Sequence, residues 1–284
     1  MRKQASLLLL MLAVLLPACG GGGTHRTETR PWGPGPMDDL SDPEREWRNA
    51  LVVLPLRGSA GSMITVNDGG LAFGALTGAS HATRWPVIVL IAGCERPVSP
   101  RLMRALAEQG YVTFAPDSRA RLRQPLHCEG EVLSDLDRAT RNLAPRQATI
   151  NYTFQKLQAQ DWVDTDRMFL IGERDGAAAV ATLSGAGIAG RVLAEWDCLP
   201  TDAGHGADRV ATSAASGIRN AAVAPVFAVT SAVVPTHAGD CSPFLGDSPH
   251  SAVLALHAKH SPDVLTEPVV FTELLKFLDR RIFR

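Results

Sequence analysis

The chain has 284 residues and a mass of 30.3 kDa, with 45% hydrophobic residues, so it can form one large domain or two small ones and is not wholly disordered. Its 28 basic and 29 acidic side chains nearly cancel, which excludes a basic surface for nucleic acid and a polybasic membrane patch. Aromatic residues make up only 6%, which argues against a stacking platform for single strands or a carbohydrate-binding cleft.

Residues 1–19 have the features of a targeting segment. Two basic residues precede an apolar run, Leu7 to Leu16, that is too short to span a hydrocarbon core as a helix. Residues 16–20, Leu-Pro-Ala-Cys-Gly, resemble the lipobox of bacterial lipoproteins, in which the cysteine is acylated and becomes the new N-terminus. The resemblance implies a lipid anchor at Cys19 in the bacterial cell envelope, facing the periplasm. A soluble secreted protein cut by ordinary signal peptidase is the alternative.

A flexible tether is predicted for residues 20–48. It begins with four glycines, Gly20 to Gly23, and continues through several prolines and an acidic stretch without apolar periodicity. The absence of aspartate after Cys19 favours the outer membrane as the site of the anchor. The remaining residues, 49–284, are predicted to form the folded domain.

The folded domain shows an alternation of strand and helix signals. Near its start, residues 63–66 and 71–76 flank Asn-Asp-Gly-Gly, which predicts an antiparallel hairpin. The apolar runs then predict strands over residues 87–91, 111–115, 167–171, 192–195, 226–230 and 253–256. Helical spacing and capping residues predict helices over residues 99–110, 146–158, 177–183 and 267–282.

An antiparallel hairpin followed by repeated strand–helix units is typical of an α/β fold with a doubly wound, mostly parallel sheet. Residues 199–224 are rich in Ser, Gly, Asp and Ala, and fit neither element type. We expect this segment to be either a small lid or a mobile loop.

Five cysteines minus the one in the lipobox leave four for the folded domain. An even number of cysteines in an oxidising compartment favours two disulfides, and three pairings are possible. Four buried free thiols are the alternative. The four residues are Cys94, Cys128, Cys198 and Cys241.

Residues 164–178 carry the most specific signal. An acidic loop, a strand, a Gly-x-x-x-Gly turn and a small-residue helix resemble the nucleophile elbow of α/β-hydrolases, and more closely the exported, cysteine-bearing branch of the dienelactone hydrolase family. Residues 90–94, 110–118 and 256–261 fit the same family. The resemblance covers residues 60–284 and implies an α/β-hydrolase sheet.

The resemblance also implies site residues, and the chain departs from it at the decisive position. The centre of the elbow is Arg174, where the family has Ser or Cys, and a guanidinium is always protonated and cannot act as a nucleophile. The backbone amides of Cys94 and Asp175 would stand where the family has its oxyanion hole. His260 would be the remaining triad base. The triad acid is not found, because residues 231–234 read Ser-Ala-Val-Val.

Other residues offer only weak substitutes for the missing chemistry. Asp175 would have to move to the centre of the turn to become a nucleophile, and nothing aligns Ser184 or Ser231 with His260. His257 and His260 are three residues apart, but on a strand-to-loop segment that spacing is a weak sign of metal binding. We therefore expect no metal and no cofactor.

The sheet order implied by the resemblance selects one pairing of the four cysteines. The strand before Cys94 would neighbour the strand that precedes Cys128, and the strand before Cys198 would neighbour the strand before Cys241. We therefore expect disulfides Cys94–Cys128 and Cys198–Cys241. Each would join two loops at the edge of the sheet that carries the site.

Two functional hypotheses follow. The first is a membrane-tethered, catalytically inactive relative of dienelactone hydrolases, in which Arg174 with the amides of Cys94 and Asp175 would hold a small anionic ligand. If the protein is inactive, the alternative to ligand binding is a vestigial cleft in which Arg174 forms an ion pair with Glu173 or Asp175. The second hypothesis is an active carboxylic-ester or lactone hydrolase with a displaced nucleophile. Neither predicts nucleic acid as a partner.

Overall fold

The computed structural model describes most of the folded domain and not the N-terminal segment. The described residues are 39–55, 63–66, 84–94, 96–128, 135–184, 187–196, 198, 218, 224–231, 241–245, 249–257 and 263–279. The predicted targeting segment, most of the predicted tether and most of the predicted lid therefore lie outside them. No helix among these residues is both long and apolar enough to cross a membrane.

An eight-stranded sheet forms the centre of the domain, in the order β2-β1-β4-β3-β5-β6-β7-β8. Strand β1 is antiparallel to β2 and β4, and every other neighbouring pair is parallel. The strands are β1 (Leu51–Val53), β2 (Met63–Thr65), β3 (Trp85–Ile91), β4 (Val112–Ala115), β5 (Val163–Glu173), β6 (Gly190–Ala194), β7 (Val226–Ser231) and β8 (Ala252–Leu256). The predicted doubly wound, mostly parallel sheet is confirmed.

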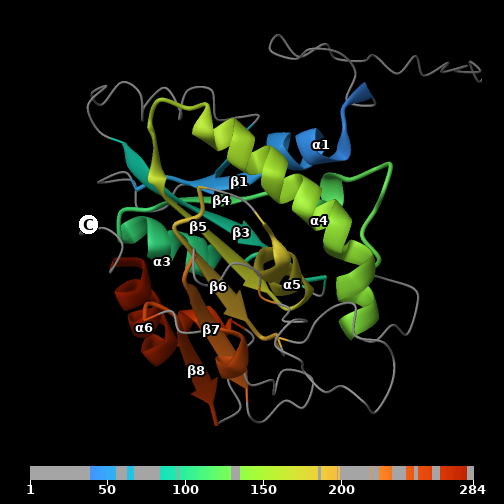
Figure 1. Cartoon of the computed structure of the whole chain (residues 1–284). Helices are drawn as coiled ribbons and strands as arrows, with labels where there is room; N and C mark the ends of the chain where they lie inside the picture. The colour runs from blue at the N-terminus through green and yellow to red at the C-terminus, as the bar shows by residue number, and fades with distance from the viewer. Residues whose placement is uncertain are drawn as a thin grey trace, which may run out of the picture. The chain divides into compact units, whose positions relative to one another are not determined.

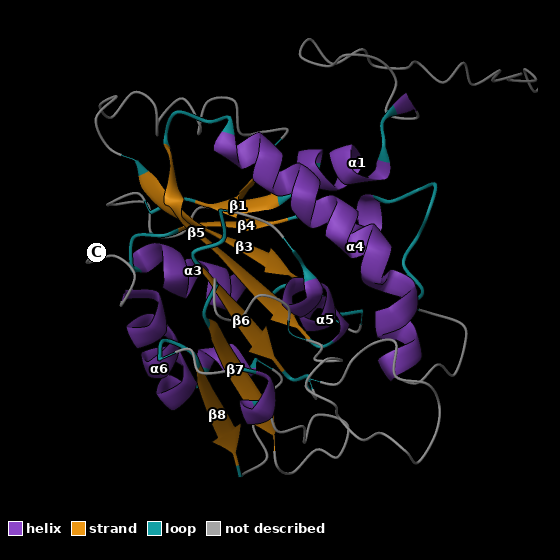
Figure 2. Ribbon diagram, viewed as in Figure 1, coloured by secondary structure: helices purple, strands orange, loops and turns teal. Residues whose placement is uncertain are grey.

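Helices cover both faces of this sheet, as Figures 1 and 2 show. Helices α4 and α5, with α1 against α4, lie on one face, and α3 and α6 lie on the other. The helices are α1 (Asp42–Arg48), α3 (Pro100–Glu108), α4 (Asp135–Gln158), α5 (Asp175–Thr182) and α6 (Pro268–Asp279), with short 3-10 helices η2 (Ser118–Ala120), η5 (Ser242–Phe244) and η6 (Val264–Thr266).

The central strands are buried on both faces because helices cover both sides, which explains their unbroken apolar runs. All residues of β3 after Trp85 are buried, and so is the stretch Met168–Gly172 of β5. The side chains alternate between two cores. Val87 and Val89 face α4 and α5, whereas Ile88 and Leu90 face α3 and α6.

The predicted tether is wrong at its end, because residues 42–48 form helix α1 and belong to the folded domain. Ser41 caps this helix by accepting a hydrogen bond from the backbone N–H of Glu44. Trp47 stacks on Phe114 with ring centroids 4.6 Å apart. The sequence suggested a tether because residues 20–48 show no apolar periodicity, whereas the structure buries Asp42 and Glu46 against partners 75 or more residues away.

Two further elements differ from the prediction. Strand β2 pairs with β1, a strand that the sequence did not predict. Residues 71–76, the expected second arm of the hairpin, lie outside the described residues. Helix α4 begins at Asp135 rather than at residue 146 and contains Pro145. The charged residues before the proline obscured the first half of this helix, which forms because α4 packs against α5 and α1.

Both predicted disulfides are confirmed. Cys94 and Cys128 join the loop after β3 to the loop after η2, with 5.0 Å between their Cα atoms. Cys198 and Cys241 join the segments that follow β6 and β7, with a Cα distance of 5.2 Å. Each bond therefore ties together two loops near the carboxyl ends of the parallel strands.

Candidate functional site

The candidate site lies at the carboxyl ends of β3, β5 and β6. The strand register pairs Ile91 with Gly172 and Glu173 with Ala194, so the three strands end side by side. This edge is where parallel α/β sheets bind their ligands. It brings together the loop after β3, the turn between β5 and α5, and the residue after β6.

The turn between β5 and α5 has the geometry that the glycine spacing predicts. A Cβ atom on Gly172 would lie 2.6 Å from the Cα of Ala177, and one on Gly176 would lie 2.5 Å from the carbonyl oxygen of Ile91. Arg174 stands between them with φ 55° and ψ −121°, a region that L-residues rarely occupy. Such a conformation costs about 1–3 kcal/mol and is held by its surroundings.

The side chain of Arg174 pairs with Glu195, not with Glu173 or Asp175 as the vestigial-cleft alternative predicted. Its Nε donates to Glu195 Oε2 at 3.1 Å. Arg96 donates to the same oxygen from Nη2 at 3.2 Å. The exposed fractions are 22% for the Arg174 side chain, 30% for Arg96 and 8% for Glu195. The carboxylate thus lies beneath two guanidinium groups that reach solvent.

Glu173 adds a second carboxyl group to this edge of the sheet. Burial raises its pKa to about 7, with repulsion from Glu195 and Asp263 adding to the rise and attraction to Arg96 opposing it. Asp263 itself accepts a hydrogen bond from Ser99 Oγ at 2.9 Å. Near neutral pH, Glu173 is therefore partly protonated.

The Asp175 carboxylate is buried on the other side of the turn. Its Oδ1 accepts the backbone N–H of Cys94 at 2.7 Å, and its Oδ2 accepts from Arg146 Nη2 at 2.7 Å and Nε at 3.2 Å. Asn142 Nδ2 also donates to Oδ2 at 3.4 Å. The Cys94 amide, which the family resemblance implied as an oxyanion donor, thus donates to a carboxylate inside the protein. Both carboxylate oxygens of Asp175 are therefore engaged in contacts within the protein.

Several predicted site residues lie outside the described part of the chain. Cys19, His260 and the positions 232–234 examined for a triad acid are among them. His257, directly after β8, and Ser184, after α5, are both exposed. The roles assigned to Cys19 and His260 therefore stay predictions.

Sequence reasoning missed Arg96, Asn142, Arg146 and Glu195. Glu195 ends a predicted strand, but its contact with Arg174 spans 21 residues, and Arg146 meets Asp175 across 29. No local pattern links such pairs. The one available signal was the neighbouring position of β5 and β6 in the sheet, which places the ends of both strands together.

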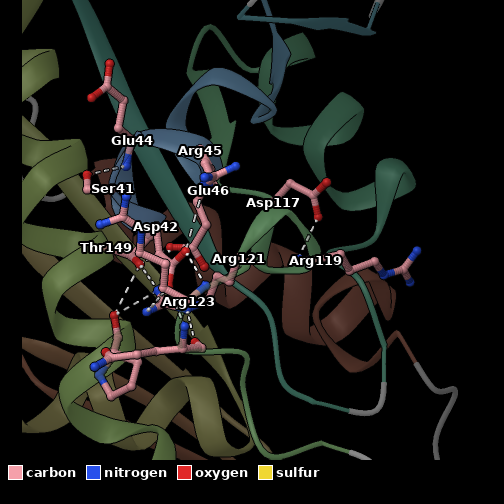
Figure 3. A network of polar contacts seen from close by, with 12 residues as sticks. Ser41, Asp42, Glu44, Arg45, Glu46, Asp117, Arg119, Arg121, Arg123 and Thr149 are labelled. Atoms are coloured by element: carbon pink, nitrogen blue, oxygen red, sulfur yellow. Dashed lines mark hydrogen bonds and ion pairs between the residues drawn. The ribbon is translucent and has the colours of Figure 1, made fainter. Parts of the chain in front are cut away.

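A second polar network, shown in Figure 3, joins α1 to α4 and to the segment after η2. Arg121 Nη1 donates to Glu46 Oε2 at 3.0 Å, and Arg121 also forms an ion pair with Asp42 at 3.7 Å. Thr149 donates to the same Glu46 oxygen. Burial raises the pKa of Glu46 to about 7, against the attraction of Arg121. We call these four residues the α1 network.

Comparison with known proteins gives no relative by sequence. No family model matches the chain, and no curated protein matches it. Solved structures do match it. Esterase 2 of Thermogutta terrifontis, phosphoramylated by tabun, aligns at 16% identity over 71% of this chain and 83% of its own, with a TM-score of 0.46. A protein from Klebsiella pneumoniae assigned as a dienelactone hydrolase aligns at 12% identity over 70% and 88%, with a TM-score of 0.47.

A third structure, named m3DLH, aligns at 20% identity over 70% of this chain and 88% of its own, with a TM-score of 0.46. The sheet order, the antiparallel pair at one edge and the helices on both faces define an α/β-hydrolase type of fold for the chain. This agrees with the α/β-hydrolase type of sheet that the sequence predicted.

Proposed function

We propose that the protein is a catalytically inactive member of the α/β-hydrolase fold class that binds a small anion in place of hydrolysing an ester. One observation carries the proposal: a charged arginine occupies the tip of the turn between β5 and α5 in a strained conformation. A guanidinium keeps its proton at any physiological pH and has no lone pair with which to attack a carbonyl carbon.

The contacts of Asp175 support the same proposal. An oxyanion hole needs amide donors that are free to bind the charge that develops on a carbonyl oxygen. In this protein the Cys94 amide donates to the Asp175 carboxylate, which Arg146 neutralises. A substrate oxygen at that amide would have to displace a buried, charge-compensated carboxylate. The residues that would accelerate ester hydrolysis instead form a stable internal contact.

Ester hydrolysis by the full-length chain in detergent tests the proposal. We expect no turnover of p-nitrophenyl acetate or butyrate above the buffer rate. Arg174→Ser should also stay near background, because loss of one triad member alone lowers rates by several orders of magnitude and residues 231–234 offer no carboxylate. Adding Val233→Asp or Val234→Asp to Arg174→Ser should raise the rate, because a carboxylate orients the triad imidazole.

The matched control replaces the predicted base in the unaltered chain. If the wild-type protein hydrolyses either ester and His260→Ala abolishes the reaction, a displaced nucleophile is at work and the proposal fails. Ester hydrolysis by Arg174→Ser alone would show instead that the arginine at this position is the only change that abolishes catalysis. It would also show that a triad acid exists elsewhere.

We further propose that the protein is held at the bacterial envelope by acylation of Cys19 and faces the periplasm. The apolar run before Cys19 and the glycines after it support this proposal. The wild-type protein should incorporate labelled palmitate and sediment with membranes. Cys19→Ala should incorporate none. A wild-type protein that is released unlabelled from cells would instead show ordinary signal-peptide cleavage.

A further inference from the structure

We propose that the disulfide Cys94–Cys128 is a reactive site that exchanges with small-molecule thiols, with Cys128 as the sulfur that is attacked and Cys94 as the sulfur that leaves. The inference goes beyond the proposed function, because it concerns neither ester hydrolysis nor anion binding. It rests on the different surroundings of the two disulfides, and of the two sulfur atoms within this one.

The two disulfides of the protein differ in their access to solvent. Cys94 and Cys128 are both partly exposed. Cys198 and Cys241 have exposed fractions of 0% and 1% and belong to the hydrophobic core. Because exchange requires that a thiolate reach a sulfur atom, a dissolved thiol has access to the first disulfide in the folded protein. It reaches the second only when the core opens.

Helix α4 provides two hydrogen-bond donors to the sulfur of Cys94. Asn142 Nδ2 lies 3.2 Å from Cys94 Sγ, and Arg146 Nη2 lies 3.8 Å from it. Both donor side chains are buried. A sulfur in a disulfide is a weak acceptor, whereas a thiolate carries a negative charge and binds the same donors more strongly. The donors therefore stabilise Cys94 more after the disulfide has broken than before.

The charges next to Cys94 are balanced, so the hydrogen bonds to its sulfur decide how well it leaves. Arg146 forms an ion pair at 2.7 Å with Asp175, whose Oδ1 accepts the Cys94 N–H. This pair adds no net charge. Asn142 is uncharged, and its Oδ1 accepts the backbone N–H of His127 at 2.9 Å, which orients the amide with Nδ2 toward the sulfur.

The sulfur of Cys128 has different surroundings. It follows a segment in which residues 122–125 and His127 are exposed. Within the described part of the chain, no group donates a hydrogen bond to Cys128 Sγ. Exchange is faster when the leaving thiolate is more stable and when the attacked sulfur is accessible. Both factors favour attack on Cys128 and departure of Cys94.

The exchange takes place in two steps. The thiolate of a small thiol attacks Cys128 Sγ and forms a mixed disulfide there, while the old bond breaks and its electron pair goes to Cys94 Sγ. A second thiol then attacks the outer sulfur of the mixed disulfide and releases Cys128. The two cysteine sulfurs take up the two electrons and the two protons that the thiols lose, and the thiols leave as a small-molecule disulfide.

Reduction of the full-length chain in detergent by glutathione tests the inference. Free thiols are first blocked with iodoacetamide, and thiols released later are trapped with N-ethylmaleimide and located by mass spectrometry of peptides. We expect Cys94–Cys128 to be reduced at least about tenfold faster than Cys198–Cys241, because only the first is accessible in the folded state. At early times, glutathione should be attached to Cys128 and N-ethylmaleimide to Cys94. Both results are obtained on the unaltered protein.

Two variants in helix α4 make the test specific. Asn142→Asp keeps the acceptor for the His127 N–H and replaces the donor to Cys94 by a charged oxygen. It should slow the reduction at least about threefold, since the leaving thiolate loses a donor and faces a like charge. Asn151→Asp adds the same charge at an exposed position of the same helix and should be reduced at the wild-type rate. If Asn142→Asp does not fold, Asn142→Leu removes the donor without adding a charge and should also slow the reduction.

The inference is overturned if the two disulfides are reduced at the same rate, or if Cys198–Cys241 is reduced first. Glutathione attached to Cys94 instead of Cys128 would overturn the assigned direction of attack. A folded variant of Asn142 that is reduced as fast as Asn151→Asp would show that the donors to Cys94 do not assist its departure. None of these outcomes depends on whether the protein hydrolyses esters.

Discussion

The α1 network and the charged residues at the carboxyl ends of the parallel strands differ in how completely they are buried. The second group consists of Arg96, Glu173, Arg174 and Glu195 and is called the edge cluster. Each contains a glutamate whose pKa burial raises to about 7, Glu46 in the first and Glu173 in the second. In the α1 network, all of the side chains are buried. In the edge cluster, both arginines reach solvent.

Hydrogen bonding shows the same difference. Asp42 accepts the backbone N–H groups of Leu122, Arg123 and Gln124 at 2.7–3.0 Å, in addition to its ion pair with Arg121. Its many donors lower its pKa despite the opposing effect of burial. Arg96, by contrast, keeps a buried nitrogen that finds no acceptor in the described residues.

The comparison separates a closed group of charges that holds the fold together from a group that is partly open to solvent. A buried polar network stabilises a structure when each member has partners, and a partly satisfied one is unstable unless something completes it. The α1 network attaches α1 to α4 and fixes the segment after η2. In the edge cluster, the two arginines share one buried carboxylate oxygen and remain partly exposed.

The largest expected effect is on folding, from Arg121→Ala. This variant leaves Glu46 and Asp42 without their buried cation, so we expect the free energy of unfolding to fall by about 3–5 kcal/mol. Urea denaturation followed by circular dichroism measures the change. Arg174→Ala should cost less than about 1 kcal/mol, because the pair it breaks is partly exposed to solvent.

Arg167→Ala is the control for arginine removal in general, since its pair with Asp164 has side chains 25% and 23% exposed. It should change the free energy of unfolding by at most about 1 kcal/mol. Equal losses for Arg121→Ala and Arg174→Ala would contradict the distinction between the two clusters.

A smaller effect is expected from the strained backbone of Arg174. Its conformation suits glycine better than any residue with a Cβ atom. Arg174→Gly should therefore unfold with a free energy about 1 kcal/mol higher than Arg174→Ala. At the exposed helical position Ala148 in α4 the order should reverse, with Ala148→Gly about 1 kcal/mol less stable than the wild type. Identical stabilities of the two Arg174 variants would show that the turn is not strained.

Local sequence patterns were sufficient to predict the central strands, helix α3 and the turn between β5 and α5. Apolar runs located the central strands because both faces of a parallel sheet are buried, and the ends of α3 followed from Ser99 and Gly110. The spacing of Gly172 and Gly176 placed Arg174 at the tip of the turn, because no side chain fits at either glycine. The disulfide pairing required the sheet order implied by the family resemblance.

Only the tertiary structure decided the partners of the charges. Nothing in the local sequence links Arg174 to Glu195, turns the Asp175 carboxylate onto the Cys94 amide, or folds the charged residues 42–48 into a helix against α4. A charged side chain has many candidate partners along the chain, and the choice depends on which strand ends and helix faces meet in space. Hydrophobic periodicity is a local property of the chain, whereas the pairing of buried charges is a property of the whole fold.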